Sequence, residues 1–363
     1  MELSTRNYCI ILAGGRGKRL WPTSRMERPK QFIDFFGTGR TQLQSTFDRM
    51  ATILPKENIF ICTSLEYDHW VREQLPELSE NRILTEPVIR NTAPSVAWGG
   101  VCIHRECADA RIVVVPSDQV IVREDAFRKN VLDGLNFVGN HDIMLTMGIK
   151  PSRPEPGYGY IQMGETTEFE GITKVQSFTE KPEREFATMF MQSGEFLWNT
   201  GMFLCNAQHL HDFFMEVIKD MPYRMANLLT MESAEERRQY VKDYYPAYPN
   251  LSMDKAALEM TDNVYVMQCD FGWADLGTWH AAYECMQKQD DDNVVIDSQV
   301  MMEDCKGNII KLPKGHVGVI NGLEGYIVAE EGDVLLICKK SDSSSLIRKY
   351  VNEVGIRFGE KYI

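Results

Sequence analysis

The chain has 363 residues, 44% of them hydrophobic and 25% charged, which is an ordinary composition for a globular protein. Its formal net charge of −13 argues against general affinity for nucleic acid or an anionic membrane, because binding phosphate without regard to sequence requires a cationic face. A chain of this length predicts one large domain with a smaller appendage.

No apolar run approaches the roughly 20 residues that span a bilayer, and the start MELSTRNYC lacks the apolar stretch of a signal peptide. We therefore expect a cytoplasmic protein with no membrane partner. Nine cysteines lie between Cys9 and Cys338 without a CxxC pair, so we expect neither a disulfide framework nor a structural zinc site. Most of them are interpreted as small buried hydrophobic residues.

Short apolar runs alternate with helix-length amphipathic stretches through the first two thirds of the chain, which predicts a mainly parallel sheet flanked by helices. Each run is short and almost entirely apolar, as expected of strands that are covered on both faces. The clearest runs are residues 8–13, 58–63, 111–116 and 143–149. Between Gly157 and Phe178 the pattern changes, and we predict antiparallel strands added at one edge of the sheet.

The sequence pattern changes again near residue 290, where the acidic run DDDN begins. The segments NIIKL, HVGVI, YIVAE and VLLICK are closely spaced and separated by Gly, Pro or Asn, which predicts a β-rich region. A final helix is predicted from SDSSSLIRKYVNEVG, with its apolar residues on one face and Gly355 ending it. We predict two domains, residues 1–288 and 289–363.

The first predicted strand runs into a glycine-rich turn, in YCIILAGGRGKRLWP. Glycine exposes backbone N–H groups and lets the chain approach a ligand closely, a geometry that binds phosphate. Six cations and one acid lie between Arg16 and Lys30, so this segment is locally +5 in an acidic protein. A polyphosphate ligand explains the contrast, and a glycine turn with solvated cations is the simpler alternative.

Two common phosphate loops do not fit this turn. A Walker A loop requires Ser or Thr after its lysine, but Lys18 is followed by Arg19, and its first glycine position holds Leu12. The dinucleotide fingerprint matches Gly15 and Gly17, but Leu20 replaces its third glycine. The remaining pattern is GGRGKRLWP followed by RPKQ.

Two acids are candidates for binding a divalent cation, since Mg²⁺ takes carboxylate oxygen and keeps several waters. Asp118 follows the strand-like run IVVVPSD, and ligands of open α/β sheets bind at the carboxyl ends of strands. Asp275 lies in CDFGWADLGTW, framed by two tryptophans and two glycines. Each has a plainer interpretation, as a turn or helix cap for Asp118 and as a loop acid beside a core tryptophan for Asp275.

Three further segments contain groups that suit a sugar phosphate. FTEKP contains Glu180 and Lys181, WNTGMFLC contains Asn199 and Thr200, and GYGYI contains Gly159, where a sugar ring can lie against backbone. In isolation none of these segments is specific, because a Glu-Lys pair before a proline turn is common and glycine often lies beside aromatics in strand turns.

Taken in chain order, nine segments together resemble the mannose-1-phosphate guanylyltransferases, within the sugar-1-phosphate nucleotidylyltransferases. The resemblance covers roughly residues 8–285, and EPVIRNTAPS and DFGWADLGTW are typical of the guanylyl branch. The segments are GGRGKRLWP, RPKQF, EPVIRNTAPS, VVPSD, GYGYI, FTEKP, WNTGMF, NLSMDKAALEMTDNVYV and DFGWADLGTW.

The resemblance implies a Rossmann-like α/β fold of the GT-A type, with a mixed sheet flanked by helices and a small C-terminal domain like a left-handed β-helix. It implies a Mg²⁺-dependent reaction of GTP with α-D-mannose 1-phosphate that gives GDP-mannose and pyrophosphate. It also implies a homodimer. Some relatives carry an additional cupin-type isomerase domain, which we do not expect in a chain ending at Ile363.

Site residues follow from the same resemblance. Arg19, Lys30, Asp118, Lys181 and Asp275 are implied to be catalytic, with Asp118 and Asp275 as the metal ligands. Glu180, Lys181, Gly159, Asn199 and Thr200 are implied to bind the sugar phosphate. The implied nucleotide-binding residues are Leu12, Ala13, Gly14, Gly15, Gly17, Arg19, Lys30, Glu86, Asn91, Thr92, Ala93 and Ser117.

Three alternatives remain open. Another member of the superfamily would use a different nucleotide and glucose 1-phosphate, since the phosphate-binding residues are shared. A non-catalytic sensor of GDP-mannose would be expected to lose a metal ligand or a phosphate-binding cation, but all of these are present. A GT-A glycosyltransferase usually carries a D-x-D motif, and VVVPSDQ does not match it.

Overall fold

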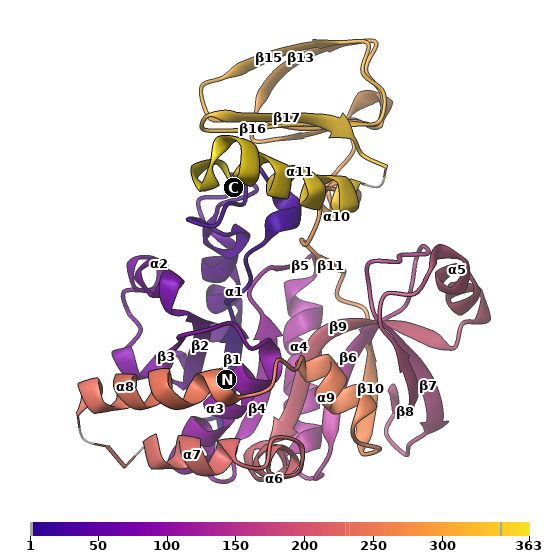
Figure 1. Ribbon diagram of the computed structural model, residues 1–363. Helices are drawn as coiled ribbons and strands as arrows, with labels where there is room; N and C mark the ends of the chain where they lie inside the picture. The colour runs from indigo at the N-terminus through magenta and orange to yellow at the C-terminus, as the bar shows by residue number, and fades with distance from the viewer. Residues whose placement is uncertain (1–2, 229, 232, 342) are drawn as a thin grey trace. The chain divides into compact units, whose positions relative to one another are not determined.

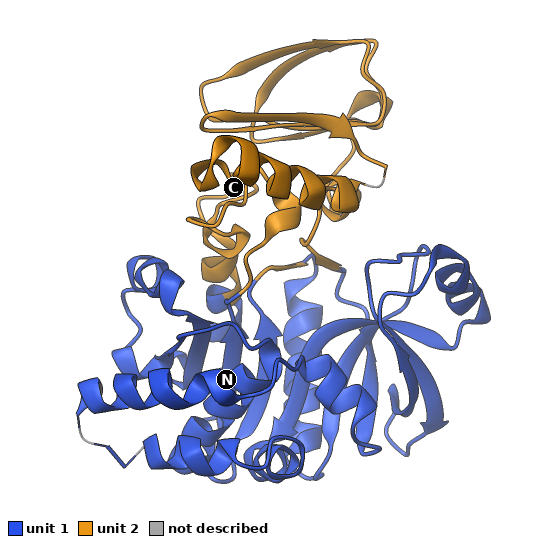
Figure 2. Cartoon of the chain, viewed as in Figure 1, with its two compact units in different colours: residues 1–14, 47–117, 121–273 blue, residues 15–46, 118–120, 274–363 orange. Residues whose placement is uncertain are grey.

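A computed structural model describes residues 3–228, 230–231, 233–341 and 343–363. These residues form two units, which are coloured separately in Figure 2. The first unit comprises residues 1–14, 47–117 and 121–273, and the second comprises residues 15–46, 118–120 and 274–363. Most of the glycine-rich segment thus groups with the C-terminal part of the chain. The two domains predicted on either side of residue 288 stay a prediction.

A mixed sheet forms the centre of the first unit, with the strand order β3-β2-β1-β4-β9-β6-β10-β8-β7 among the described residues (Figure 1). Strands β3, β2, β1 and β4 are parallel, and β6 is parallel to β10, while β9, β8 and β7 pair antiparallel to their neighbours. The bounds are β1 Asn7–Leu12, β2 Ile59–Ser64, β3 Ile83–Glu86, β4 Arg111–Pro116, β6 Met144–Ile149, β7 Tyr160–Thr166, β8 Ile172–Thr179, β9 Phe196–Asn206 and β10 Val264–Cys269. The predicted strands and the antiparallel edge are confirmed.

Helices cover both faces of this sheet. Phe203 and Cys205 of β9 belong to the core beneath α3, whereas Leu204 between them lies against Gly134 of α4. Alternate side chains of a strand point to opposite faces, so α3 and α4 lie on opposite sides. The helices are α1 Gln42–Ala51, α2 Asp68–Gln74, α3 Thr92–Glu106, α4 Glu124–Val138, α5 Arg184–Ser193, α6 Ala207–Val217, α7 Met221–Leu228, α8 Ala234–Tyr244 and α9 Met253–Glu259.

The second unit contains most of the β structure predicted near the C-terminus. Strands β12, β14 and β16 pair in parallel, β17 adds antiparallel to β16, and β13 pairs in parallel with β15. Their bounds are β12 Val294–Ile296, β13 Gln299–Glu303, β14 Ile309–Lys311, β15 Val317–Asn321, β16 Tyr326–Glu331 and β17 Val334–Lys339. Parallel pairing of successive short strands is compatible with a β-helix, in which the chain winds through one strand after another. The left-handed β-helix itself stays a prediction. The short strands β5 (Gln119–Ile121) and β11 (Trp273–Asp275) form a separate pair.

Side-chain amides tie successive strands of this β region together. Asn308 donates through Nδ2 to Asn293 Oδ1 at 2.9 Å and to the carbonyl of Leu323 at 2.7 Å. Asn293 in turn donates to the carbonyl of Cys305 at 2.7 Å. Because both amides are buried, these bonds satisfy backbone groups that have no access to water.

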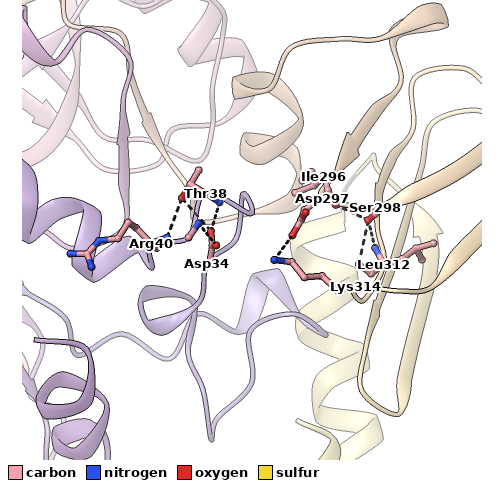
Figure 3. A network of polar contacts seen from close by, with 9 residues as sticks. Asp34, Thr38, Arg40, Ile296, Asp297, Ser298, Leu312 and Lys314 are labelled. Carbon is pink, nitrogen blue, oxygen red and sulfur yellow. Dashed lines mark hydrogen bonds and ion pairs between the residues drawn. The ribbon is translucent and has the colours of Figure 1, made fainter.

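A loop from the N-terminal third of the chain belongs to the same unit. Asp34 accepts from the backbone N–H of Thr38 at 2.9 Å and of Gly39 at 2.7 Å, which closes the loop (Figure 3). A Cβ on Gly37 would overlap the carboxylate of Asp297, so this loop packs directly against the β region. Asp297 also forms an ion pair with Lys314 at 3.6 Å.

Two helices accompany the β region, α10 (Trp279–Cys285) and α11 (Ser343–Phe358). The predicted apolar face of the final helix is confirmed, with Ile347 and Val351 in the core. The prediction that Gly355 ends this helix is wrong, because α11 continues to Phe358. Gly355 instead lies in the helix beside Ile363, and the glycine with a positive φ of 106° is Gly359, just after the helix.

All nine cysteines lie in the described part of the chain, and none forms a disulfide. Cys107 and Cys285 are partly exposed and the others are buried, as predicted for small hydrophobic residues. Across the residues the structure describes, no helix has the length and apolarity needed to cross a bilayer.

Candidate active site

The glycine-rich turn begins where β1 ends. Ala13 donates to the carbonyl of Cys62 at 2.7 Å and accepts from the hydroxyl of Thr63 at 3.1 Å, and Ser117 N donates to Leu12 O at 3.0 Å. These bonds join the ends of three adjacent parallel strands, β1, β2 and β4. The residues predicted to start the phosphate loop, Leu12 to Gly14, therefore lie with Ser117 at one edge of the sheet.

Within the second unit, the loop packs tightly against Lys30. Gly17 has a φ of 59°, and a Cβ there would lie 2.5 Å from Ser24 Oγ and 2.9 Å from Lys30 Cγ. Only glycine fits this position without strain. Gln31 donates to the carbonyl of Gly15 at 2.8 Å, so both sides of the loop are anchored by the segment that contains Lys30.

Lys30 brings together the two acids predicted to bind metal. Its Nζ forms an ion pair with Asp118 Oδ2, lies 3.9 Å from Asp275 Oδ1 and donates to the carbonyl of Leu276 at 3.2 Å. The whole Lys30 residue is only 9% exposed. Two carboxylates that are 157 positions apart in the sequence thus share one ammonium group.

Arg19 lies beside Asp275. A Cβ on Gly277 would meet Asp275 Oδ2 at 2.8 Å and Arg19 Nη2 at 2.9 Å, so Gly277 leaves room for both groups. Arg19, Lys30, Asp118 and Asp275 are called the phosphate cluster below. It contains two cations and two acids, all of them predicted from the sequence.

Two tryptophans bond to backbone carbonyls near the segments that contain Arg19 and Asp275. Trp279 is fully buried and donates through Nε1 to the carbonyl of Trp21 at 3.0 Å. Trp21 donates through its own Nε1 to the carbonyl of Tyr362 at 2.7 Å. The tryptophan of the GTW segment therefore fixes the loop after Arg19 to the stretch that follows Asp275.

The two acids of the phosphate cluster are compatible with a divalent cation. The carboxylates of Asp118 and Asp275 converge on one cationic group, so a divalent ion can bind where the ammonium of Lys30 now balances their charge. Among the described residues, no group of three or more His, Cys, Asp or Glu side chains is arranged to bind a metal. Two carboxylates suffice for Mg²⁺, which usually completes its shell with water and substrate phosphate.

A second group of predicted residues gathers in the first unit. Lys181 forms an ion pair with Glu180, and the backbone of Lys181 has a φ of 47°, which is uncommon for a residue with a side chain. A Cβ on Gly159 would lie 3.0 Å from Glu180 Oε2, and the carbonyl of Gly159 accepts from Asn199 N at 2.8 Å. Gly159, Glu180, Lys181 and Asn199 are called the sugar cluster below.

The hydroxyl of the neighbouring residue Thr200 is bonded to backbone. Thr200 is 1% exposed, donates to the carbonyl of Met147 at 2.8 Å and accepts from Met202 N at 3.3 Å. Strand alternation does not decide which way it faces, because the register between β9 and β6 shifts here and Gly201 has a φ of 69°. The hydroxyl of Thr200 holds the sheet together at this point.

The sequence prediction missed an acid in the sugar cluster. Asn199 Nδ2 donates to Asp254 Oδ1 at 2.5 Å, and the Asp254 carboxylate lies close enough to Glu180 and Lys181 for their charges to affect its pKa. Burial raises the pKa of Asp254 and outweighs the opposing effect of the hydrogen bond from Asn199. The available signal was the segment NLSMD, in which Ser252 can cap a helix and place Asp254 in its first turn.

Asn91, Thr92 and Ala93, which are predicted to bind the nucleotide, lie at the start of α3 and are called the base loop below. Asn91 caps α3 with a φ of 65°, Thr92 accepts from Met253 N at 2.7 Å, and buried Ala93 donates through its N–H to the carbonyl of Leu251 at 3.0 Å. The loop is therefore held by the segment that leads into α9.

Glu86 lies at the end of β3 and is 6% exposed. Burial raises its pKa from 4.5 to about 7, even though the hydroxyl of Ser95 donates a hydrogen bond that favours the charged form. Because Ser95 belongs to α3, Glu86 anchors the base loop as well as being a candidate acceptor for a base.

Known proteins resemble this chain over most of its length. Residues 8–292 match the Nucleotidyl transferase family. A mannose-1-phosphate guanylyltransferase of Salmonella montevideo is 32% identical, over 98% of this chain and 75% of the relative. The alginate biosynthesis protein AlgA of Pseudomonas aeruginosa is 33% identical, over 91% of this chain and 69% of its own.

A solved structure from Thermus thermophilus, described as a mannose-1-phosphate geranyltransferase, has a TM-score of 0.84 and 28% identity to this chain. The match covers 96% of this chain and 99% of that one. The similarity thus extends through both units.

Proposed function

Because this chain belongs to the nucleotidyl transferase family and is a nucleotidyltransferase, we propose that it transfers GMP from GTP to α-D-mannose 1-phosphate. The products are GDP-mannose and pyrophosphate. The observation that carries the proposal is the phosphate cluster, in which Lys30 holds Asp118 and Asp275 beside a glycine-rich loop. The relatives named mannose-1-phosphate guanylyltransferase support the choice of substrates.

The proposed reaction is a single in-line displacement. A phosphate oxygen of mannose 1-phosphate attacks the α-phosphorus of GTP, and the bond from that phosphorus to the pyrophosphate oxygen breaks. No covalent intermediate with the protein is required, so the protein acts by positioning the reactants and by stabilising charge. Backbone N–H groups around Gly14, Gly15 and Gly17 bind the triphosphate.

The phosphate cluster supplies the charge stabilisation. Arg19 and Lys30 stabilise the negative charge that develops on the α-phosphate and on the leaving group. Asp118 and Asp275 would hold Mg²⁺, which neutralises phosphate charge when bound. Lys30 already lies within ion-pair distance of both acids, so it is positioned to orient them before substrate binds.

The sugar cluster receives the second substrate. Lys181 binds the phosphate of mannose 1-phosphate, which reduces the repulsion between the two anionic substrates. Glu180 accepts hydrogen bonds from sugar hydroxyls, and the absence of a side chain at Gly159 leaves room for the ring. Asn199 offers one amide N–H, because the other donates to Asp254 and its Oδ1 already accepts from Gly201 N at 3.1 Å and from Thr146 at 3.4 Å.

Guanine is proposed to bind at the loop of Asn91, Thr92 and Ala93. Guanine is distinguished from adenine by its N1–H, its exocyclic amine and its O6, so a selective site needs acceptors for the first two groups and a donor for the third. Glu86 is the proposed acceptor for the amine. A cytoplasmic location and a homodimer are further predictions that belong to this proposal.

A matrix of substrates tests the function. Release of pyrophosphate is measured for GTP, ATP, UTP and dTTP, each with mannose 1-phosphate and with glucose 1-phosphate. We expect the highest kcat/KM for GTP with mannose 1-phosphate. A higher value for UTP with glucose 1-phosphate would assign the chain to another branch of the family, and no release with any pair would support a sensor.

A further inference from the structure

The segment NLSMD, residues 250–254, connects the base loop to the sugar cluster. Leu251 N donates to the carbonyl of Arg90 at 3.2 Å, and Arg90 donates through Nε to the carbonyl of Pro246 at 3.1 Å. Two residues later, Met253 N donates to the hydroxyl of Thr92 at 2.7 Å. Both ends of the segment are therefore fixed, and Asp254 follows directly.

Local bonds also hold Asp254 in place. Ser252 caps α9 by accepting from Lys255 N at 3.1 Å, which sets the first turn of the helix around Asp254. Met253, its neighbour on one side, is buried in the core of the first unit. The backbone at Asp254 is thus held by bonds on both sides.

The carboxylate meets Asn199 from the sugar cluster. Asn199 Nδ2 donates to Oδ1 of Asp254 at 2.5 Å, and Asn199 is itself held by Thr146 and Gly201 through its Oδ1. A carboxylate has about four acceptor positions. The bond from Asn199 occupies one of them, and the backbone N–H of Asp254 itself also interacts with the carboxylate. Asp254 as a residue is partly exposed, and its carboxylate has further acceptor positions beyond these two.

The charges of the sugar cluster act on the same carboxylate. Glu180 raises the pKa of Asp254 and Lys181 lowers it, after the larger effects of burial and of the bond from Asn199. The helix α9, which contains Asp254, packs against β8, the strand that leads to Glu180 and Lys181, so the three charged groups belong to one region of the first unit. A carboxylate that is already oriented there can accept from a hydroxyl without a further loss of side-chain freedom.

We propose that Asp254 is a specificity-determining residue that accepts a hydrogen bond from a hydroxyl of the sugar phosphate, while Asn199 orients its carboxylate. This inference rests on the proposed function of the sugar cluster. The competing explanation is that Asp254 only holds Asn199 in place. A site built to bind a hydroxyl discriminates strongly against an analogue that lacks it, which gives the two explanations different consequences.

The test pairs substitutions at Asp254 with substrates that lack one hydroxyl each. The values of kcat/KM are measured for the wild type, Asp254→Ala and Asp254→Asn with mannose 1-phosphate and with its 2-deoxy, 3-deoxy, 4-deoxy and 6-deoxy analogues. We expect Asp254→Ala to lose about 10- to 100-fold with mannose 1-phosphate. With one deoxy analogue, the wild type and the variant should agree within about threefold, because the partner hydroxyl is already missing.

A purely structural role predicts a different pattern. In that case Asp254→Ala loses the same factor with mannose 1-phosphate and with every deoxy analogue, and this result would overturn the inference. Asp254→Asn preserves the shape of the side chain, so it gives the same comparison if the alanine variant does not fold. Asp262→Asn, an exposed change of the same chemistry in the same region, serves as the control and should leave all values unchanged.

The outcomes for the inference and for the proposed function are separable. A wild-type protein that does not use mannose 1-phosphate contradicts the proposed function, and the same series is then run with the deoxy analogues of the sugar phosphate that it does use. A wild-type protein that uses mannose 1-phosphate, with variants that show no hydroxyl-dependent loss, contradicts only the role of Asp254.

Discussion

The phosphate cluster and the sugar cluster each contain a lysine paired with an acid, but they differ in exposure. The side chains of Lys30 and Asp118 are 11% and 19% exposed, whereas those of Lys181 and Glu180 are 54% and 46% exposed. Solvent screens the second pair, and it contributes little to the stability of the free protein. The first pair is largely shielded, so its charges are oriented before substrate arrives.

This difference in exposure indicates that the two clusters have different functions. Preorganised charge in a shielded site lowers the energy of a transition state, because no reorganisation is needed at the moment of reaction. An exposed pair that can separate is better suited to bind an incoming anion. We therefore expect changes in the phosphate cluster to lower kcat and changes in the sugar cluster to raise the KM for the sugar phosphate.

Asp118→Asn is expected to have the largest effect. It removes a proposed metal ligand and the ion-pair partner of Lys30, and we expect kcat to fall at least about 100-fold. Steady-state release of pyrophosphate measures the change, and circular dichroism checks the fold. Asp133→Asn, which removes an exposed pair with Lys129, is the control and should have no effect. Near-normal turnover in Asp118→Asn would contradict the proposed mechanism.

Lys181→Ala tests the other half of the comparison. Loss of a charge-assisted bond to phosphate should raise the KM for mannose 1-phosphate about 10- to 100-fold and leave the KM for GTP within about threefold. Lys174→Ala removes an exposed lysine from β8, the strand that precedes Lys181, and serves as the control. If kcat fell while both KM values stayed constant, the two clusters would not differ in the way proposed.

Glu86→Gln extends the comparison to a buried acid without a cation. Its pKa is 4.5 in the unfolded chain and about 7 in the folded protein. Both states are protonated below pH 4.5. As pH rises to 7 the unfolded state ionises first, so the wild type loses stability that the glutamine variant keeps.

The expected sign follows from that order of ionisation. Relative to the wild type, Glu86→Gln should gain roughly 2–3 kcal/mol in the free energy of unfolding between pH 5 and pH 8. Urea denaturation at both pH values measures this difference in the free energy of unfolding. The variant Glu165→Gln, at an exposed position, should show no such trend. A difference independent of pH would mean that Glu86 is ionised in the folded protein. A raised KM for GTP would separately support its contact with guanine.

The smallest expected difference is that between Gly17→Ala and Gly39→Ala, and it tests how closely the loop packs against Lys30. Gly39 is a matched control, since it also has a positive φ but has no atom within 4 Å of an added Cβ. Both variants bear the cost of a left-handed conformation, roughly 1–2 kcal/mol. We expect Gly17→Ala to be less stable than Gly39→Ala by about a further 1 kcal/mol in urea denaturation. Equal losses would show that Lys30 is not confined by the loop.

Part of the phosphate cluster was predictable from local signals in the sequence, whereas the pairing of Asp118 with Asp275 was implied by the family resemblance. A glycine-rich turn after an apolar strand and an excess of cations in an acidic chain both point to phosphate. Asp118 follows a central strand, and the ends of parallel strands meet at one edge of a sheet. The confirmed mixed sheet depended on similarly local patterns.

The remainder depended on three-dimensional context that single segments do not contain. Thr200 was assigned to the sugar site with Asn199, whereas its buried hydroxyl bonds to the backbone of Met147 in the folded chain. Asp254 was missed because its role depends on Asn199, which lies 55 residues earlier in the chain. Gly355 was assigned as a helix end on its residue type alone, while α11 continues through it.

The burial of most cysteines has a practical consequence. Cys107 belongs to the first unit and Cys285 to the second, and these are the partly exposed thiols among the nine. Buried thiols react slowly with maleimides, so dye labelling should be confined largely to these two positions. One fluorophore pair on the natural sequence would then report, by energy transfer in single molecules, whether nucleotide binding changes the separation of the two units.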